Sequence, residues 1–264
     1  MVAETQEVRS VELHLCMDYR IEDTDATDAW RLITQTGYGR KDVAVVRSAG
    51  PIPFLDDLRE RASNSNLKLV IFATHNQCGM AGAVFSHISG VQLKVAPETL
   101  NAIITLADAV KEEAGKTETA ITSSGDVEKF MPAAIKGLVE KKLKEAGRTD
   151  VKVMFTSPLT VSSGQHVNNV IAVIGLTDST DMELKTAAGT NPAYVVRATR
   201  PDQAMLSLDI AGGGLGKTEF VLMPGSQRWS EATRACSNSL SSLPTLPKGA
   251  TVTLKPAINT KIKL

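Results

Sequence analysis

Two cysteines and one histidine are the residues of this chain best suited to chemistry. Cys16 opens the motif Cys16-x-Asp18-x-Arg20, and His75 and Cys78 form a second motif, His75-x-x-Cys78. Two thiolates and one imidazole are a ligand set suited to Zn²⁺, and three protein ligands leave the fourth tetrahedral position open. The residue types therefore predict a catalytic zinc site rather than a structural one.

Asp18 and Arg20 add a second chemical feature beside Cys16. In an extended segment, side chains two residues apart share a face, so all three could point the same way. A carboxylate beside Zn²⁺ can occupy the open position or accept a hydrogen bond from a bound water or hydroxide. An arginine in a forked pair with Asp18 favours the second arrangement. The simpler alternative is a surface ion pair of little energetic value.

Both motifs follow apolar runs of strand character, at Val11–Leu15 and 67–72. Strand and helix patterns alternate over this region, which predicts an α/β fold with a largely parallel sheet. Ligand sites in such folds form at the carboxyl ends of strands. The helices expected from apolar spacing cover residues 26–33, 54–62, 79–87, 97–114 and 127–146. The helix at 79–87 would start beside the metal, so its first N–H groups, near Gly79, could bind an anion.

The composition narrows the classes of partner. Lys and Arg together number 29, as do Asp and Glu, so the formal charge is zero and the chain lacks the field expected of a nucleic-acid binder. No apolar run approaches the length of a membrane span, and residues 1–7 show no signal-peptide pattern. We expect a soluble, cytoplasmic protein with no membrane partner. Three cysteines argue against a disulfide framework, and Cys236 is expected to be a spare buried thiol.

The chain changes character after residue 150. Strand-like runs separated by Ser-, Gly- and Pro-rich connections occur at 151–155, 167–176, 193–198, 205–210, 219–223 and 250–254. We therefore expect a zinc-binding domain at 1–150 and a strand-rich, divergent domain at 151–264. Val45-Val46-Arg47 recurs as Val195-Val196-Arg197, and the same offset sets Gly225 against His75 and Arg228 against Cys78. The second domain could thus be a degenerate, metal-free second copy, although chance similarity is about as good an explanation.

The motifs together resemble the β-class carbonic anhydrases. The resemblance rests on Cys16-x-Asp18-x-Arg20, on His75-x-x-Cys78-Gly79, on their separation, and on Val45-Val46-Arg47-Ser48-Ala49-Gly50, which looks like the family's V-x-R-N-A-G segment. It covers roughly residues 1–90 well, with Ser48 and Thr74 departing from the usual Asn and Gly.

The resemblance implies a β-carbonic-anhydrase-like fold and a function. Zn²⁺ would be held by Cys16, His75 and Cys78, with Asp18 and Arg20 as the catalytic dyad and Gly79 near the substrate. The implied reaction is reversible hydration of carbon dioxide to bicarbonate by zinc-bound hydroxide. Family members normally complete each site across a dimer interface, so a homodimer or an intrachain pseudo-dimer is expected.

Alternatives stay open. Relatives in the family hydrolyse carbonyl sulfide or carbon disulfide with the same ligands, and a non-catalytic structural zinc protein would keep Asp18 on the metal. The stretch Ala211–Thr218 loosely matches a phosphate-binding loop, but such a loop needs a helix directly after it. His14 and His87 could carry a proton, but neither is assigned that role.

Overall fold

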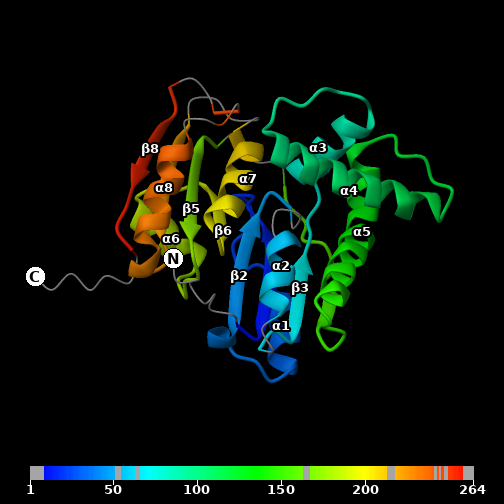
Figure 1. The fold of residues 1–264 in the computed structure, drawn as a ribbon, viewed down its shortest axis with the longest axis horizontal. Coiled ribbons are helices and arrows are strands. Elements are labelled where there is room, and N and C mark those ends of the chain that lie inside the picture. The colour runs from blue at the N-terminus through cyan, green and yellow to red at the C-terminus, as the bar shows by residue number, and fades with distance from the viewer. Residues whose placement is uncertain are drawn as a thin grey trace, which may run out of the picture.

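The computed structural model describes residues 9–50, 55–63, 66–162, 167–212, 218–240, 243, 245–246 and 249–257. Eight strands form one sheet in the order β4-β3-β1-β2-β6-β5-β7-β8 (Figure 1). The strands are β1 (Val11–Cys16), β2 (Val43–Ser48), β3 (Leu69–Ala73), β4 (Lys152–Phe155), β5 (Asn169–Ile174), β6 (Tyr194–Ala198), β7 (Glu219–Pro224) and β8 (Thr251–Leu254). The α-helices are α1 (Thr27–Gln35), α2 (Leu55–Ala62), α3 (Gly79–Ile88), α4 (Pro97–Gly115), α5 (Ser124–Glu145), α6 (Asp181–Ala188), α7 (Pro201–Gly212) and α8 (Ser230–Leu240).

The expected α/β class with a mostly parallel sheet is confirmed. Every pair of neighbouring strands is parallel except β2 and β6, which meet antiparallel with Arg47 opposite Arg197. All six residues of β2 are buried, as expected of a central strand covered on both faces.

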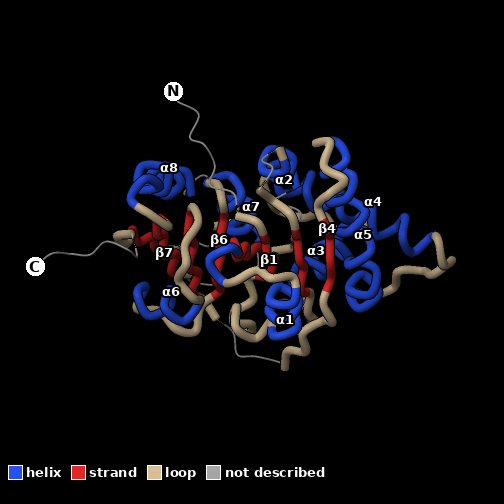
Figure 2. Tube along the Cα trace, turned by 90° about the horizontal axis from the view of Figure 1, so that it is seen from below, coloured by secondary structure: helices blue, strands red, loops and turns tan. Residues whose placement is uncertain are grey.

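Helices cover both faces of this sheet. Figure 2 shows α1 and α6 on one face and α2, α7 and α8 on the opposite face. The buried side chains divide in the same way. One large cluster joins α2, α3, α4, α5, α7 and α8 to the sheet, while α1 and α6 each cover a smaller apolar cluster on the other face. This three-layer arrangement leaves the carboxyl ends of the strands free to carry a site.

The sheet consists of two parts with the same strand order. In the first half (β1–β4), β1 lies between β2 and β3, and β4 is the outer strand; in the second half (β5–β8), β5, β6, β7 and β8 take the matching places. The antiparallel contact between β2 and β6 joins the two halves, which are related to each other by an approximate two-fold axis at this contact. β4 comes after residue 150 in sequence but pairs with β3, so the division between the halves falls after Phe155.

One strand prediction in the second half is wrong. Residues 205–210 belong to α7, in which the buried positions recur at helical spacing: Gln203 and Ala204, then Ser207, Leu208 and Asp209. With α6 and α8 also present, the second half alternates strands and helices instead of being strand-rich. Residues 213–217 of the glycine-rich stretch lie outside the described part. The next element along the chain is the strand β7, not the helix that a phosphate-binding loop requires.

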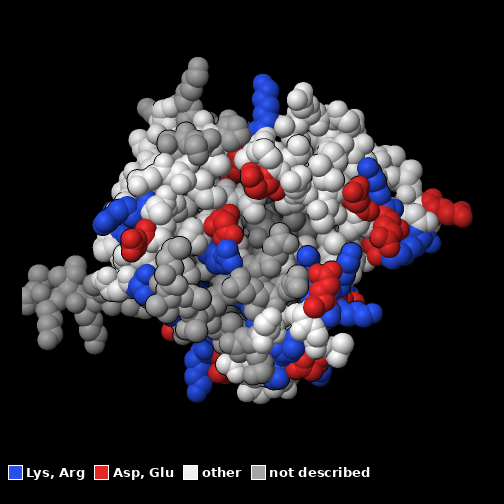
Figure 3. Space-filling model, viewed as in Figure 1, with Lys and Arg blue, Asp and Glu red and all other residues white. Residues whose placement is uncertain are grey.

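The surface agrees with the balanced composition. On the face drawn in Figure 3, acidic and basic side chains are interspersed over the molecule. Within the described ranges, none of the helices is both long and apolar enough to cross a bilayer.

Candidate metal centre

The parallel pairing of β1 and β3 brings the two motifs together. Leu15 lies opposite Ala73, so Cys16 at the end of β1 and His75 just beyond β3 emerge at the same edge of the sheet. Cys78 is the residue immediately before α3. One potential ligand atom from each of Cys16, His75 and Cys78 lies within 4.8 Å of the other two. In the described part of the chain this is the one group of three or more His, Cys, Asp and Glu side chains that could hold a metal ion.

The hydrogen bonding of His75 suits this residue to bind a metal ion. His75 Nδ1 lies 2.7 Å from the carbonyl oxygen of Asn76 and can donate a hydrogen bond to it. In the neutral imidazole that bond would leave Nε2 unprotonated, with its lone pair available to a metal ion. Nε2 is buried and has no hydrogen-bond partner. A buried nitrogen without a partner is costly, and a metal ion would satisfy it.

The Cys16 and Cys78 thiols influence each other's ionisation. Interaction with Cys78 lowers the pKa of Cys16, while the same interaction together with burial raises the pKa of Cys78 well above its usual value. Burial lowers the pKa of His75, but the nearby Cys78 thiol, the Asn76 carbonyl and the charge of Asp18 together outweigh burial, and the net shift is upward. A divalent cation among these groups would favour both thiolates and a neutral imidazole. The donor set therefore fits a soft or borderline metal such as Zn²⁺.

Asp18 and Arg20 form the forked ion pair expected from their spacing. Arg20 Nε donates to Asp18 Oδ1 at 2.9 Å, and Arg20 Nη2 donates to Oδ2 at 2.6 Å. Burial alone would raise the pKa of Asp18, but the hydrogen bonds from Arg20 outweigh it and lower the pKa. Asp18 is therefore an ionised acceptor, and it is not part of the three-residue ligand group.

Gln77, which lies within the His75-x-x-Cys78 motif, also holds Arg20 in place. Arg20 Nη1 donates to Gln77 Oε1 at 3.0 Å, and Nη2 donates to the Gln77 carbonyl at 3.1 Å. Gln77 has a φ of 55°, in the left-handed region that non-glycine residues rarely adopt. The turn between His75 and Cys78 is thus held in an unusual conformation by the same arginine that holds Asp18.

Glu128 supports the motif from α5. Its Oε1 accepts a hydrogen bond from the backbone N–H of Cys78 at 2.8 Å. Glu128 also lines an inner cavity, together with His14, Met131 and the three ligand residues. The sequence offered no signal for this role, because α5 is separated from both motifs by α3 and α4.

Arg47 anchors the loop that carries Cys16 and Asp18. Its guanidinium is fully buried and donates to the carbonyl oxygens of Cys16 at 2.7 Å, Asp18 at 2.8 Å and Ile21 at 2.8 Å. Arg47 also forms a buried ion pair with Asp181 from the second half. The backbone of the candidate site is therefore tied to residues far away in sequence.

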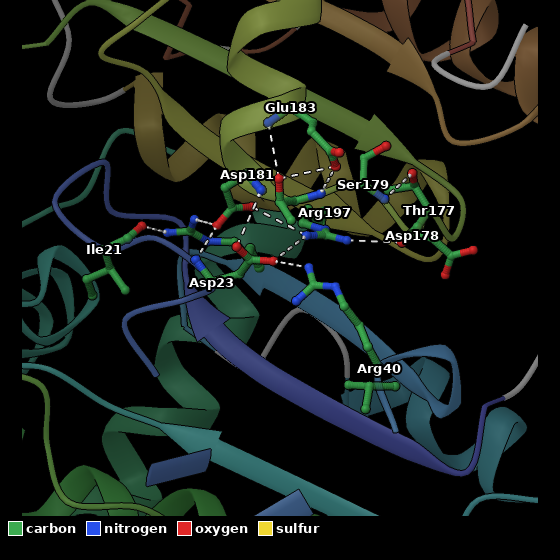
Figure 4. Close-up of polar contacts among 12 residues, drawn as sticks. Ile21, Asp23, Arg40, Thr177, Asp178, Ser179, Asp181, Glu183 and Arg197 are labelled. Carbon is green, nitrogen blue, oxygen red and sulfur yellow. Dashed lines mark hydrogen bonds and ion pairs between the residues drawn. The ribbon is translucent and has the colours of Figure 1, made fainter. Parts of the chain in front are cut away.

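Asp181 belongs to a buried cluster of charges on the approximate two-fold axis (Figure 4). Arg197 Nη1 lies 3.4 Å from Asp181 Oδ1 and 3.6 Å from Asp23 Oδ2. Arg40 Nη2 reaches Asp23 Oδ2 at 2.6 Å. Each aspartate thus meets an arginine of the other half, so the cluster stabilises the junction only while both halves are folded together.

The second half has no equivalent ligand group in its described residues. Strand pairing sets Ile174 of β5 in the place of Cys16, and Gly225 and Arg228 come after β7 where His75 and Cys78 come after β3. The neighbouring space is filled by an indole ring. A Cβ added at Gly175 would lie 2.2 Å from Trp229 Cδ1.

A second cavity, which we call the outer pocket, lies beside the Asp18–Arg20 pair and is lined by residues of both halves. Its lining includes Asp18, Arg20, Gln77, Gly79, Tyr194 and Ile210. Gly79 is the first residue of α3, so the start of that helix faces the pocket as expected. The remaining candidates lie elsewhere. His14 is buried and pairs with Glu12 at 3.0 Å, His87 is in the last turn of α3, and Cys236 is buried within α8, where burial raises its pKa to about 12.

Comparisons with protein-family models, with curated proteins and with solved structures found no match to this chain. The arguments for function therefore come from the residues and their geometry.

Proposed function

We propose that this protein is a zinc-dependent carbonic anhydrase that hydrates carbon dioxide reversibly to bicarbonate. The observation that carries the proposal is the separation of roles within one site. Three soft or borderline ligands converge, while the nearby Asp18 is held by Arg20 outside the ligand group. A purely structural zinc site would be closed by a fourth protein ligand.

The metal and the residues that would hold it can be assigned from the donor set. Cys16, His75 and Cys78 would bind Zn²⁺, and His75 would bind through Nε2 because Nδ1 is engaged with the Asn76 carbonyl. When bound, Zn²⁺ supplies a Lewis acid that makes water acidic enough to serve as a nucleophile near neutral pH.

The remaining residues orient the reactants. Asp18, ionised and able only to accept, takes a hydrogen bond from the attacking water and so directs the oxygen lone pair toward carbon dioxide. Arg20 keeps Asp18 charged and fixed in position. The N–H groups at the start of α3, near Gly79, favour the negative charge that develops as bicarbonate forms.

The second half would act as a metal-free partner that closes this site. Three observations support this role: the matching strand order of the halves, the charges exchanged between them, and the contribution of Tyr194 and Ile210 to the outer pocket. A fused second copy that has lost its ligands would have this arrangement.

The decisive experiment is stopped-flow measurement of carbon dioxide hydration on protein of known zinc content. We expect rapid hydration by the wild type and, for Asp18→Asn, a loss of roughly 100-fold or more in rate with zinc retained, since a positioned proton acceptor contributes about 10² to 10⁴. Asp28→Asn, on the exposed face of α1, is the matched control and should leave the rate unchanged.

Two results would overturn the proposal. Zinc bound at one equivalent with no hydration at any pH would contradict it and direct attention to carbonyl sulfide or carbon disulfide, tested in the same apparatus. Full activity in Asp18→Asn would show that the Asp18–Arg20 pair is not the dyad.

A further inference from the structure

The antiparallel junction places one aromatic residue of the second half at the candidate site. Because β2 and β6 run in opposite directions with Arg47 opposite Arg197, the beginning of β6 lies beside the end of β2. The backbone N–H of Val195 donates to the carbonyl oxygen of Met17 at 3.0 Å. Tyr194 is therefore fixed next to the loop that carries Asp18.

The side chain of Tyr194 faces the outer pocket. Its ring meets the ring of Tyr19 edge-on, with the centroids 5.4 Å apart, and it lines the pocket together with Asp18 and Arg20. In the described part of the chain no group hydrogen-bonds the Tyr194 hydroxyl. Burial and, after it, the negative charge of Asp18 raise the pKa of Tyr194, so the phenol is protonated at neutral pH and can donate.

The approximate two-fold axis provides an internal comparison. Ala44 in β2 and Tyr194 in β6 stand the same distance before the paired arginines, so each reaches the strand ends of the opposite half. Ala44 faces the half in which Ile174 and Gly225 replace metal ligands, whereas Tyr194 faces the half that has Cys16 and His75. Of these two matching positions, only the one beside the candidate ligand group carries an aromatic hydroxyl.

An anion bound in the outer pocket would need a hydrogen-bond donor from the pocket wall. Asp18 is acceptor-only and ionised, and it would repel an anion held beside the metal ligands. The guanidinium nitrogens of Arg20 already donate hydrogen bonds to Asp18 and Gln77. Tyr194 is a wall residue whose hydroxyl donor remains available.

We propose that Tyr194 is a ligand-binding residue of this site and that its hydroxyl donates a hydrogen bond to an oxygen of a small oxyanion, bicarbonate. The assignment rests on the proposed function, because bicarbonate is the product of that reaction. It makes the second half a determinant of ligand specificity as well as a structural partner.

The test uses the full-length protein loaded with Co²⁺, whose visible absorption reports anion binding without turnover. Bicarbonate and thiocyanate are titrated into the wild type and into Tyr194→Phe, which keeps the ring and removes the hydroxyl. Tyr38→Phe, packed beside α1 on the opposite face of the sheet, is the matched control. Thermal melting verifies that each variant is folded.

We expect the Kd for bicarbonate to rise about tenfold in Tyr194→Phe, as for the loss of one hydrogen bond to a charged acceptor. Thiocyanate, whose sulfur end is a weak acceptor, should change less than about twofold, and Tyr38→Phe should alter neither affinity. An unchanged affinity for bicarbonate, or equal weakening of both anions, would overturn the assignment.

The outcomes also separate this inference from the proposed function. A wild type that binds bicarbonate through Tyr194 but does not hydrate carbon dioxide would refute the anhydrase function and support the role of Tyr194. Rapid hydration by the wild type, with Tyr194→Phe binding bicarbonate normally, would support the anhydrase function and refute the role of Tyr194.

Discussion

Replacing Arg47 by Met tests how the second half supports the candidate site. The substitution removes hydrogen bonds to the carbonyl oxygens of Cys16, Asp18 and Ile21 and breaks the ion pair with Asp181. Removing one partner of a buried ion pair costs about 3 to 5 kcal/mol. Because Asp181 retains Arg197 at 3.4 Å, we expect a loss of about 3 to 4 kcal/mol in the free energy of unfolding. That is a large part of the roughly 5 to 15 kcal/mol available to a folded protein.

The assay is urea unfolding monitored by both fluorescence and circular dichroism. Arg31→Met is the control, since Arg31 is exposed on α1 and pairs only locally with Asp28, and its loss should change stability by less than about 0.5 kcal/mol. Adding Asp181→Asn to Arg47→Met should cost less than the sum of the two single changes, because the partners act on each other. A loss below about 1 kcal/mol for Arg47→Met would refute the view that this arginine anchors the site.

Two further predictions concern acid stability and the thiols. Glu12 is buried against Arg61, and although burial opposes ionisation, the charge of Arg61 helps lower the pKa of Glu12 to about 2. Its contribution is therefore complete above the ordinary pKa of 4.5 and is lost as the pH falls from there toward 2, so urea midpoints measured between pH 6 and pH 2.5 should fall less steeply for Glu12→Gln than for the wild type. Cys78→Ser should abolish stoichiometric zinc in elemental analysis, whereas Cys236→Ser should leave it intact; equal loss in both would contradict the ligand assignment.

The position of the ligand group could be predicted because it depends on local patterns. Apolar runs before each motif indicate β1 and β3, and parallel strands necessarily end at one edge of a sheet. Cys16, His75 and Cys78 can therefore be placed together without any knowledge of the intervening loops. The spacing of Asp18 and Arg20 likewise predicts their ion pair, since a two-residue separation is a local property.

The supporting residues could not be predicted, because their partners are distant in sequence. Glu128 reaches Cys78 through the packing of α5, and Asp181 reaches Arg47 across the junction between the halves. The run at residues 205–210 is compatible with a strand in sequence because Leu206, Leu208 and Ile210 alternate with the polar Ser207 and Asp209. Its helical nature is visible only when the buried positions from Gln203 to Leu208 are known.

The covalent connection between the halves has a consequence for behaviour at low concentration. Two separate chains that met through a surface like the β2–β6 junction would come apart on dilution, with loss of the shared pocket. Here the encounter is intramolecular, so the local concentration of one half around the other is set by the linking segment and not by the amount of protein. The pocket between the halves is thus kept assembled in a single molecule, at one site per chain.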